Sequence, residues 1–551
     1  MGVAAWLQIA AVLAFVGVLH VPLGDYMARV YTGARHWRVE RLVYRVCGID
    51  PDSEQRWGAY LRSVLAFSLA GVLVLYAILR LQGRLPLGLG HPGMPAALAF
   101  NTAVSFTTNT SWQNYAGEST LGHLALATGL GTEAFASSAV GLAVGVALIR
   151  GLARHRADRL GNFWVDLVRG SLRILLPMAA VSAVVLIALG VVQDLGSWQA
   201  HTTLAGARQS ILGGPIASWE PIKLMSGDGG GAFNASSAHP FENPTALTNL
   251  FEIVLMLLIP AAFIRTFGRM VGDRRQGWAL LAVAGVLFVA SVAGTTTAEV
   301  LHHNTVPTAV GAATEGTETR IGVPGSALFG ASATSSADGA GNSSYDSFTS
   351  IGGGLLLATM MLGEVSPGGT GSGLYALIVL ALLAVFLGGL MIGRTPEYLR
   401  KRIQAREIKL VSLYILTAPA LILIGTALSI ALPTGRASIG NPGAHGLTET
   451  AYALTSSANS NGSAFAGFTG NTPYYNVVLA VAMLLGRYLP IVFVLGLAGS
   501  LARQRRGVVT SGTLPSHKPL FIGLLTVCVL IFSALDFVLV LALGPVAEGL
   551  H

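Results

Sequence analysis

The sequence predicts an all-α membrane protein of ten spanning helices, in which four similar helix–pore-loop–helix units surround one central pathway. Three observations predict this fold class: an apolar composition, an alternation of basic and uncharged loops, and a polar stretch that recurs in four loops. Of 551 residues, 52% are hydrophobic and 11% are charged, against roughly 25% charged in an ordinary soluble domain. So few charges cannot cover a soluble fold of this size, which excludes a soluble enzyme, a disordered chain and a secreted disulfide scaffold.

Ten apolar runs are long enough to cross a bilayer, which takes about 20 residues. The first run has no basic region before it and no clear cleavage site, so we interpret it as a retained helix and not as a signal peptide. A further run at 351–362 is short and forms the first half of the seventh span. The ten spans lie near 3–23, 62–81, 122–149, 173–193, 248–266, 277–297, 374–392, 408–432, 476–500 and 517–543.

Lys and Arg are distributed very unevenly between the loops. Of the 34 basic residues, 23 fall in the first, third, fifth, seventh and ninth loops, and 5 fall in the four loops between them. Basic loops stay on the cytoplasmic side of a membrane. The alternation therefore predicts a cytoplasmic position for 24–61, 151–172, 267–276, 393–409 and 501–518, with both termini outside.

The four uncharged loops contain similar polar stretches. They read TTNTS at 107–111, SGDGG at 226–230, SADGA at 336–340 and NSNGS at 459–463. A single such stretch is typical of a turn. When the stretches are aligned on Asn109, Asp228, Asp338 and Asn461, however, an aromatic residue stands nine positions upstream in all four, at Phe100, Trp219, Phe329 and Tyr452. This recurrence indicates a fourfold internal repeat.

Each repeat is predicted to contain a span, a short re-entrant helix, a polar extended segment and a second span. Polar backbone at membrane depth is tolerated only where it is buried in protein or lines a watery cavity. Four such segments around one axis can turn carbonyl oxygens inward and replace the water shell of a monovalent cation. The negative ends of the short helices favour the same charge, and oxygen ligands suit an alkali metal ion.

Longer strings around these stretches resemble a known family. The loops resemble the filters of the potassium-channel superfamily, fused four to a chain. Within that group the chain resembles the family of potassium-binding A subunits of the Kdp high-affinity potassium-transporting ATPases. The resemblance covers nearly the whole chain, including its first and last spans. The strings that carry it lie at 107–113, 229–234, 239–245, 346–349, 362–365, 393–398 and 461–467.

The resemblance implies which residues form the filter and that K⁺ is the transported ligand. The family usually has Gly-Thr-Asn where this chain has Ser226-Gly227-Asp228, and Ser or Thr where it has Ala337, so two carboxylates appear instead. Three arrangements are open for them: a bound cation offsets their charge, one is protonated, or both turn away from the axis to bond backbone N–H groups. The implied filter positions are Thr108, Asn109, Thr110, Gly227, Asp228, Gly229, Ala337, Asp338, Gly339, Ser460, Asn461 and Gly462, supported by Gln113.

Two features lie where the resemblance implies a gate or a coupling element below the filter. Arg487 lies near the middle of the ninth span, where an ionisable residue is functional by default, although it could also snorkel to an interface. The seventh span is interrupted at 363–373 by five Gly and a Pro, which cannot remain helical. The resemblance implies a gating loop there, and Glu364 is its only charge.

The chain lacks the motifs of ATP chemistry: it has no Gly-Lys pair for a phosphate loop and no Asp-Lys-Thr-Gly phosphorylation string. We therefore expect no catalytic site here, and the resemblance implies a P-type catalytic B subunit with small C and F subunits in a bacterial inner membrane. The segment from Arg394 to Arg402 resembles a short basic helix, which is either a membrane anchor or a partner contact. The residues expected at that contact are Arg394, Arg400, Lys401 and Arg402.

The predicted organisation divides the chain into a flanking helix with its loop, four pore units, and a final flanking helix. The main alternatives are a channel subunit of the Trk, Ktr or HKT type without ATP-driven pumping, and a secondary transporter with inverted repeats. The flanking spans favour the pump subunit over the channel, and four loops of one orientation argue against inverted repeats. The predicted boundaries are 1–61, 62–150, 151–266, 267–393 (with the broken helix), 394–500 and 501–551.

Overall fold

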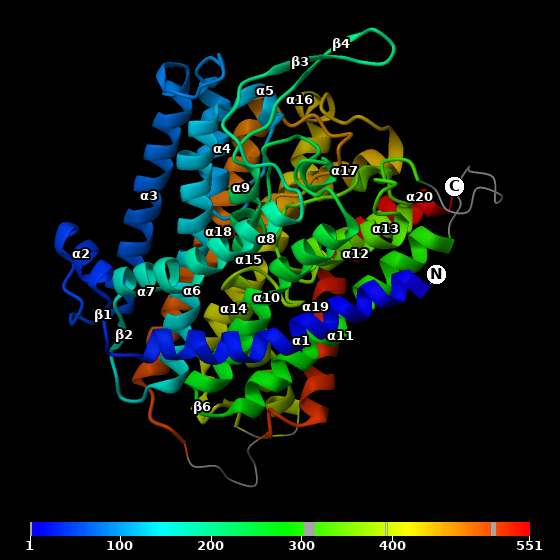
Figure 1. Cartoon of the computed structure of the whole chain (residues 1–551). Coiled ribbons are helices and arrows are strands. Elements are labelled where there is room, and N and C mark those ends of the chain that lie inside the picture. Colours follow the sequence, from blue (N-terminus) through cyan, green and yellow to red (C-terminus); the bar gives the residue numbers. More distant parts are fainter. Residues whose placement is uncertain (1–2, 302–313, 392, 394, 508–513, 551) are drawn as a thin grey trace.

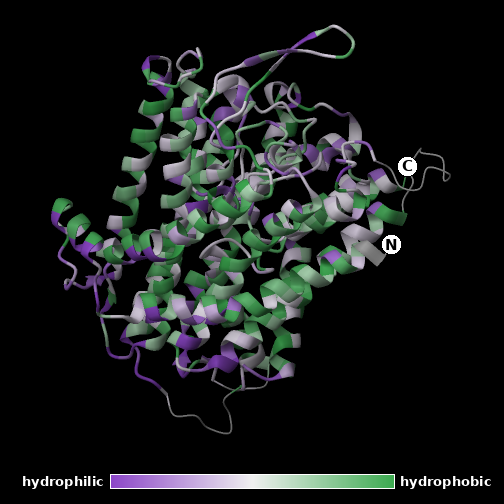
Figure 2. Ribbon diagram, viewed as in Figure 1, coloured by the Kyte–Doolittle hydropathy of each residue, from purple (hydrophilic) through white to green (hydrophobic). Residues whose placement is uncertain are grey.

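A computed structural model of the chain describes residues 3–301, 314–391, 393, 395–507 and 514–550. Within these residues, ten helices are long and apolar enough to cross a membrane, and they match the ten predicted spans one for one. In Figure 2 the long helices are coloured mostly as hydrophobic, and hydrophilic residues are concentrated in the connecting loops. Six spans consist essentially of one helix each: α1 (Val3–Thr32), α10 (Ala246–Met270), α11 (Arg274–Leu301), α14 (Ser372–Met391), α15 (Ala405–Ala431) and α18 (Pro473–Arg503). The other four are continuous runs of helical elements that contain α3 (Trp57–Leu81) in Trp57–Arg84, α6 (Gly131–Ala153) in Ala125–Ala153, α8 (Leu176–Ala188) in Phe163–Ala188 and α19 (Pro519–Leu541) in Pro519–Gly549.

Four short helices precede the polar stretches, as the repeat predicts: α4 (Ala96–Thr107), α9 (Ile216–Ser226), α12 (Val323–Ser335) and α17 (Gly443–Asn459). Each packs against the long helix that begins its own unit, which is α3, α8, α11 or α15 respectively. Each also packs against a helix of the preceding unit: α4 on α18, α9 on α6, α12 on α10 and α17 on α13 (Ser350–Met361). Because the first unit contacts the last in this way, the four units close into a ring.

The seventh span is broken, as predicted. Helix α13 ends at Met361, residues 362–371 are not helical, and α14 begins at Ser372. Positive φ angles at Gly363, Gly368 and Gly371 account for the break, because these backbone conformations do not occur within a helix.

Contacts link the described parts of the five basic loops to one another. Strands β1 (Gln55–Arg56), β2 (Arg159–Gly161) and β6 (Lys401–Arg402), which belong to three of these loops, lie in the lower half of the molecule in Figure 1. Strand β1 of the first basic loop pairs with β2 of the second basic loop. Lys401 and Gly507 link the later loops through hydrogen bonds to the Arg154 and Arg400 carbonyls, and Ser516 bonds to Gln276. The four uncharged loops share a cavity at the opposite end. The two-sided alternation predicted from basic residues is therefore confirmed.

Two hairpins differ from the predictions. The segment expected as a short basic helix forms strands β5 (Glu397–Tyr398) and β6 (Lys401–Arg402), and the intervening Leu399 and Arg400 both have positive φ. Such a pair of φ values makes a two-residue turn that suits a hairpin and cannot continue a helix. An exposed hairpin of β3 (Gln199–Thr202) and β4 (Arg208–Ile211), at the top of Figure 1, was not predicted at all.

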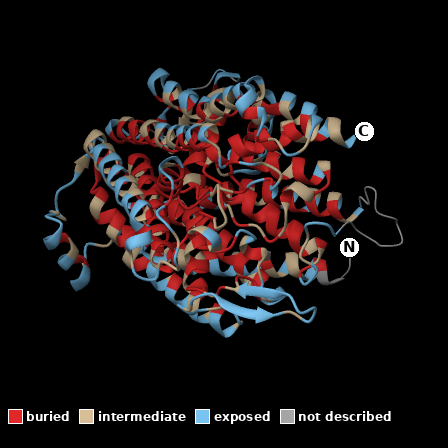
Figure 3. Cartoon of the chain, turned by 90° about the horizontal axis from the view of Figure 1, so that it is seen from above, coloured by how far each residue is buried: buried red, intermediate tan, exposed pale blue. Residues whose placement is uncertain are grey.

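The buried core lies where the units meet. Helices α6, α10 and α14 are largely buried at the centre, whereas α1, α3, α15 and α19 are mostly exposed around it. Figure 3 shows this buried centre and the exposed rim, which is the distribution expected when the outer helices face lipid. The shorter elements are α2 (Arg38–Val46), α5 (Gly117–Thr120), α7 (Phe163–Arg169), α16 (Pro433–Arg436), α20 (Ala547–Gly549), η1 (Gln82–Arg84), η2 (Ala125–Leu130), η3 (Gly170–Leu175), η4 (Ser236–Ala238), η6 (Tyr345–Ser347) and η7 (Ala542–Val546).

Candidate functional site

A three-residue stretch of loop follows the end of each short helix. We call these four stretches the filter segments; they are 109–111, 227–229, 337–339 and 460–462. A shared backbone hydrogen bond fixes their register, because the N–H of the central residue donates to the carbonyl five residues earlier. Thr110, Asp228, Asp338 and Asn461 are therefore structurally equivalent. The bonds are Thr110 N to Ser105 O (3.0 Å), Asp228 N to Lys223 O (3.2 Å), Asp338 N to Ala333 O (3.0 Å) and Asn461 N to Ser456 O (2.8 Å).

The alignment of Asn109 with Asp228, Asp338 and Asn461 is wrong by one residue. Asn109 instead corresponds to the residue before each of them, and these four residues all have left-handed backbones. Their φ values are 60° at Asn109, 64° at Gly227, 56° at Ala337 and 65° at Ser460.

The corrected register changes the first filter segment. Ser111, which was not among the predicted positions, becomes equivalent to Gly229, Gly339 and Gly462. Thr108 is therefore not equivalent to a residue of the other filter segments. It caps the C-terminal end of α4, and its hydroxyl donates a hydrogen bond to the Ser105 carbonyl at 3.1 Å. Left-handed residues with side chains are uncommon, so their clustering here marks the loops as a candidate site.

The side chains at the central positions bond within the loops. Asp228 Oδ1 accepts a bond from the Ser111 hydroxyl at 2.7 Å, and Asp338 Oδ1 accepts one from the Ala340 N–H at 2.9 Å. Asn461 Oδ1 similarly accepts from the Ser463 N–H at 3.0 Å. Asp338 thus bonds a backbone N–H, as the third of the arrangements open for the two carboxylates requires, whereas Asp228 bonds a side-chain hydroxyl of the first filter segment.

Glycines allow the filter segments to approach very closely. A Cβ atom on Gly462 would lie 2.0 Å from the Thr110 carbonyl oxygen and 3.2 Å from that of Asp228. A Cβ on Gly339 would lie 2.7 Å from the Asn461 carbonyl oxygen. Carbonyl oxygens of three equivalent residues thus gather around the same narrow space, which is the arrangement that can replace the water shell of a cation.

Hydrogen bonds join neighbouring filter segments. The Asn109 side-chain amide donates to the Gly227 carbonyl at 2.7 Å, and the Gly339 N–H donates to the Asp228 carbonyl at 3.0 Å. Gln113, the predicted filter support, accepts a bond from the Gly231 N–H at 2.8 Å. It therefore lies beside the second segment, where it can hold the backbone that leaves the filter.

Two cavities lie on either side of the filter segments. The outer one, of about 700 Å³, is lined by all four uncharged loops, including Ser111, Gly339 and Gly462. The inner one, of about 120 Å³, extends from Ser460 to Asp536 of α19. The filter segments thus separate a wide, polar vestibule from a smaller chamber within the helices.

The structure places both predicted gating or coupling residues on the inner cavity. Glu364 is buried, has a positive φ, and accepts a bond from the Asn461 side-chain amide at 2.9 Å. Arg487 is also buried and donates to the Ser137 carbonyl at 3.3 Å. The broken span is therefore linked directly to a filter segment, and Arg487 lines the same chamber as the carboxyl groups of Glu364 and Asp536.

Sequence reasoning missed a buried ionic network behind the second filter segment. Lys223 on α9 is fully buried, and its ammonium lies 2.8 Å from Glu220 and 3.0 Å from Glu242. Glu242 also accepts a bond from the Phe233 N–H at 3.2 Å, so Lys223 ties α9 to the chain that leaves the filter. The sequence signal that could have indicated this network was Lys223, which is one of only two basic residues in the whole loop from 194 to 247.

The residues predicted at a partner contact do not share one environment. Lys401 is buried and donates to the carbonyls of Arg154 and Leu501 at 2.6 and 2.9 Å, so its ammonium is unavailable to a partner. Arg400 and Arg402 are exposed, and Arg394 lies outside the described residues. The expectation for Lys401 was wrong because the hairpin turns this side chain toward the ends of two helices, where carbonyls attract a cation.

Comparison with known proteins gives a consistent assignment. The sequence model of the family described as "Potassium-transporting ATPase A subunit" matches residues 10–550. The chain is 56% identical over 549 residues to the potassium-transporting ATPase potassium-binding subunit of Clavibacter michiganensis, covering 99% of this chain and 98% of the relative. It is 55% identical over 546 residues to the subunit of the same name from Mycolicibacterium smegmatis, covering 98% of each.

A solved structure shares the fold. The potassium transporter TrkH from Vibrio parahaemolyticus superposes with a TM-score of 0.54 at 15% identity, over 88% of this chain and 97% of that one. This likeness supports the repeated membrane architecture, while the sequence matches extend across both flanking helices. By its sequence and its ring of four filter segments, the chain belongs to the family of potassium-transporting ATPase A subunits.

Proposed function

We propose that this chain is the potassium-binding and translocating subunit of an ATP-driven potassium uptake pump. K⁺ enters the outer vestibule, loses water to carbonyl oxygens of the filter segments, and passes into the inner cavity. The observation that carries this proposal is the convergence of the Thr110, Asp228 and Asn461 carbonyls between the two cavities. Closely spaced carbonyl dipoles favour a monovalent cation, and the C-terminal ends of the short helices behind them add negative potential.

The ATP chemistry belongs to a partner in this proposal. The partner is a P-type catalytic B subunit, accompanied by small C and F subunits, in a bacterial inner membrane with both termini of this chain outside. Glu364 and Arg487 then control the exit from the filter, since a fixed guanidinium below the carbonyls repels a cation that would leak straight through. The exposed Arg400 and Arg402 remain the candidates for contact with soluble parts of the partner.

The runner-up is a potassium channel subunit of the Trk, Ktr or HKT type, which the fold similarity to TrkH favours. The two functions differ in whether ATP hydrolysis depends on K⁺ and in whether K⁺ moves against its gradient. A pump subunit copurifies with a P-type ATPase, and the complex hydrolyses ATP only when K⁺ is added, while the isolated chain hydrolyses none.

The deciding experiment compares the purified complex with the chain alone in K⁺-stimulated ATP hydrolysis and in liposome uptake of K⁺ against a gradient. Uptake that stops when ATP is removed supports the pump. Passive uptake by the chain alone, unchanged by ATP and by the partner, would establish the channel.

A further inference from the structure

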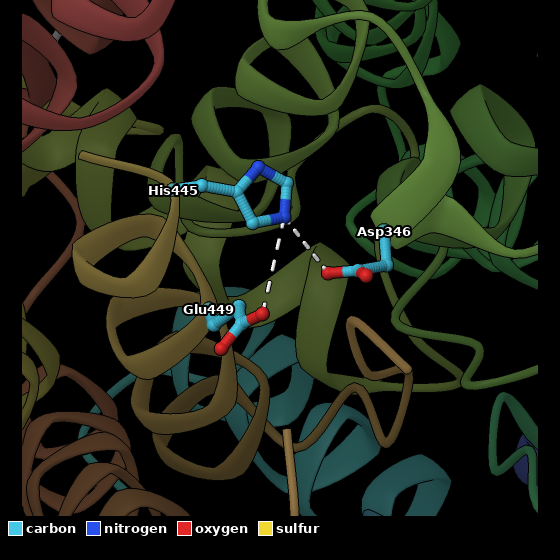
Figure 4. Close-up of side chains that lie close together, drawn as sticks. All are labelled: Asp346, His445 and Glu449. Atoms are coloured by element: carbon cyan, nitrogen blue, oxygen red, sulfur yellow. Dashed lines mark hydrogen bonds and ion pairs between the residues drawn. The ribbon is translucent and has the colours of Figure 1, made fainter. Parts of the chain in front are cut away.

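A cluster of potential metal ligands lies outside the filter segments. Asp346 follows the third filter segment in η6, while His445 and Glu449 stand one turn apart on α17 of the fourth unit. His445 Nε2 lies 2.9 Å from Asp346 Oδ1 and 4.0 Å from Glu449 Oε1. Figure 4 shows the three side chains pointing toward one another, and one ligand atom from each lies within 4.8 Å of the others.

A second layer of groups holds these side chains in place. The other ring nitrogen of His445, Nδ1, lies 2.9 Å from the Glu548 carboxylate of α20. Glu449 accepts bonds from the Asn441 side-chain amide at 2.6 Å and from the Gly440 N–H at 3.0 Å. A metal-binding histidine usually gives its second N–H to a carboxylate, and metal-binding carboxylates are themselves hydrogen-bonded.

Gly467 packs closely against the two carboxylates. A Cβ atom there would lie 2.5 Å from Glu449 Oε1 and 2.8 Å from Asp346 Oδ2. Any side chain at this position would therefore push the two carboxylates away from their present places.

The cluster carries excess negative charge. Asp346, Glu449 and Glu548 surround a single imidazole, so the net charge is negative even when His445 is protonated. Among the described residues, the ion pairs of these carboxylates are with His445 alone. The hydrogen bond to Asp346, opposed by burial and helped by Glu548, raises the pKa of His445 to about 9. A bound metal ion would therefore have to displace one proton.

We propose that Asp346, His445 and Glu449 bind a divalent transition-metal ion of the zinc class. One imidazole nitrogen and two carboxylate oxygens suit Zn²⁺ better than Mg²⁺ or Ca²⁺, which take oxygen ligands. Zinc bonds of about 2.0–2.2 Å place tetrahedral ligand atoms roughly 3.3–3.6 Å apart. The two separations from His445 Nε2, 2.9 and 4.0 Å, bracket that value, so small side-chain movements would complete the site.

The ion would serve as a structural link. It would join the loop after the third filter segment to α17, which leads into the fourth, and through Glu548 it would anchor the C-terminal helix α20. The side chains of His445 and Asp346 are 18% and 16% exposed, so an ion can reach them from outside the protein.

The test measures Zn²⁺ binding to the purified complex after chelator treatment, by calorimetry and by metal analysis after dialysis. We expect one high-affinity Zn²⁺ per chain, and at least about 100-fold weaker binding in His445→Gln, since losing one ligand removes several kcal/mol of binding. Asp346→Asn, which keeps the shape and a hydrogen-bonding oxygen, should also lose the site. His201→Gln, on the exposed hairpin, is the matched control and should bind as the wild type does.

A second measurement keeps the test decisive if His445→Gln fails to fold. Zn²⁺ should raise the thermal midpoint of the wild type and of His201→Gln but not that of Asp346→Asn. An ion that binds only to the folded protein stabilises the folded state, and Asp346→Asn lacks the site. Mg²⁺ at the same concentration should have no such effect. Equal Zn²⁺ binding by the wild type and Asp346→Asn, or none by either, would show that the cluster is an ion-paired link only and would overturn the proposal.

Discussion

Glycines at the third position of three filter segments determine how closely the carbonyl oxygens can gather. At Gly462 the Cα hydrogens face the Thr110 oxygen, and the backbone has a φ of +100°. A side chain here meets two separate obstacles, namely backbone strain and overlap with a carbonyl group.

Gly462→Ala should weaken the apparent affinity for K⁺ by more than about tenfold, or ~1.4 kcal/mol, because the new methyl group displaces the Thr110 carbonyl. The measurement is the K⁺ dependence of ATP hydrolysis by the assembled complex. Gly272→Ala is the matched control, with a φ of +79° and open space around its Cα. If both variants behaved alike, backbone strain and not crowding at the filter would explain the effect.

Asp228 and Asp338 differ from Thr110 and Asn461 in charge but share their backbone position. Since the Asp228 side chain accepts a bond from Ser111, an amide oxygen can replace its carboxylate. Asp228→Asn should therefore shift K⁺ affinity by less than about tenfold, or ~1.4 kcal/mol, and Asp228→Ala should do more harm because it removes the acceptor. K⁺-dependent ATPase activity measured across pH decides the matter. A loss of several hundredfold in Asp228→Asn, with no further loss in Asp228→Ala, would make the carboxylate itself the ligand.

At the residue scale, the sequence predicts which loops form the site but not their exact register. The recurring aromatic residues select an alignment that is correct for three loops and shifted in the first. There Asn101, not Phe100, stands nine residues before the equivalent residue Thr110. Register depends on where each helix stops, and that is set by backbone bonds such as Thr110 N to Ser105 O, which leave no clear pattern in side-chain types.

Among the elements, α9 is unusual because a fully buried ammonium holds it to the segment that follows its filter. Lys223 lies between Glu220 and Glu242, and Ser237 accepts a further bond from it at 3.1 Å. A buried network of this kind is costly to break, because removing one partner leaves the others charged and unpaired.

Lys223→Met should destabilise the protein by about 3–5 kcal/mol, the usual cost of breaking a buried ion pair from one side. The thermal midpoint of the purified complex should fall, and K⁺ affinity should fall with it, because the Lys223 carbonyl and side chain both support the second filter segment. Lys518→Met, at an exposed position, is the control and should change neither quantity. An unchanged midpoint in Lys223→Met would mean that the network contributes little to stability.

Hydropathy and charge predict the long elements well and the short ones poorly. All ten spans and the break after Met361 follow from composition, because a bilayer demands apolar length and Gly with Pro cannot continue a helix. The hairpin at 397–402 escapes prediction because its turn residues, Leu399 and Arg400, are not the Asn-Gly pair that usually marks such turns. Its short strands also follow no alternating apolar pattern.

On the scale of the whole molecule, the filter segments separate an outer vestibule from an inner chamber that holds both Glu364 and Arg487. The inner chamber reaches Asp536 on the last helix, so space inside the protein leads sideways from the axis of the filter. A fixed cation in that chamber acts most strongly on the ion after it has left the carbonyls.

Arg487→Gln should accordingly leave K⁺ affinity within about tenfold of the wild type, or ~1.4 kcal/mol, while transport becomes uncoupled from ATP hydrolysis. The ratio of K⁺ transported to ATP hydrolysed in proteoliposomes measures the coupling. Arg436→Gln, at the end of α16, is a control of the same chemistry outside the chamber. A normal ratio in Arg487→Gln would make Arg487 a structural anchor that holds the Ser137 carbonyl.

The central claim is that K⁺ binds among the backbone carbonyls of the filter segments. The most direct measurement is a crystal or cryo-EM structure of the whole complex with Tl⁺ or Rb⁺ in place of K⁺, using anomalous scattering where crystals allow it. The account predicts an ion between the carbonyls of Thr110, Asp228 and Asn461, and its loss in Gly462→Ala. An ion held only in the inner chamber by Glu364 or Asp536, with none among the filter carbonyls, would contradict it.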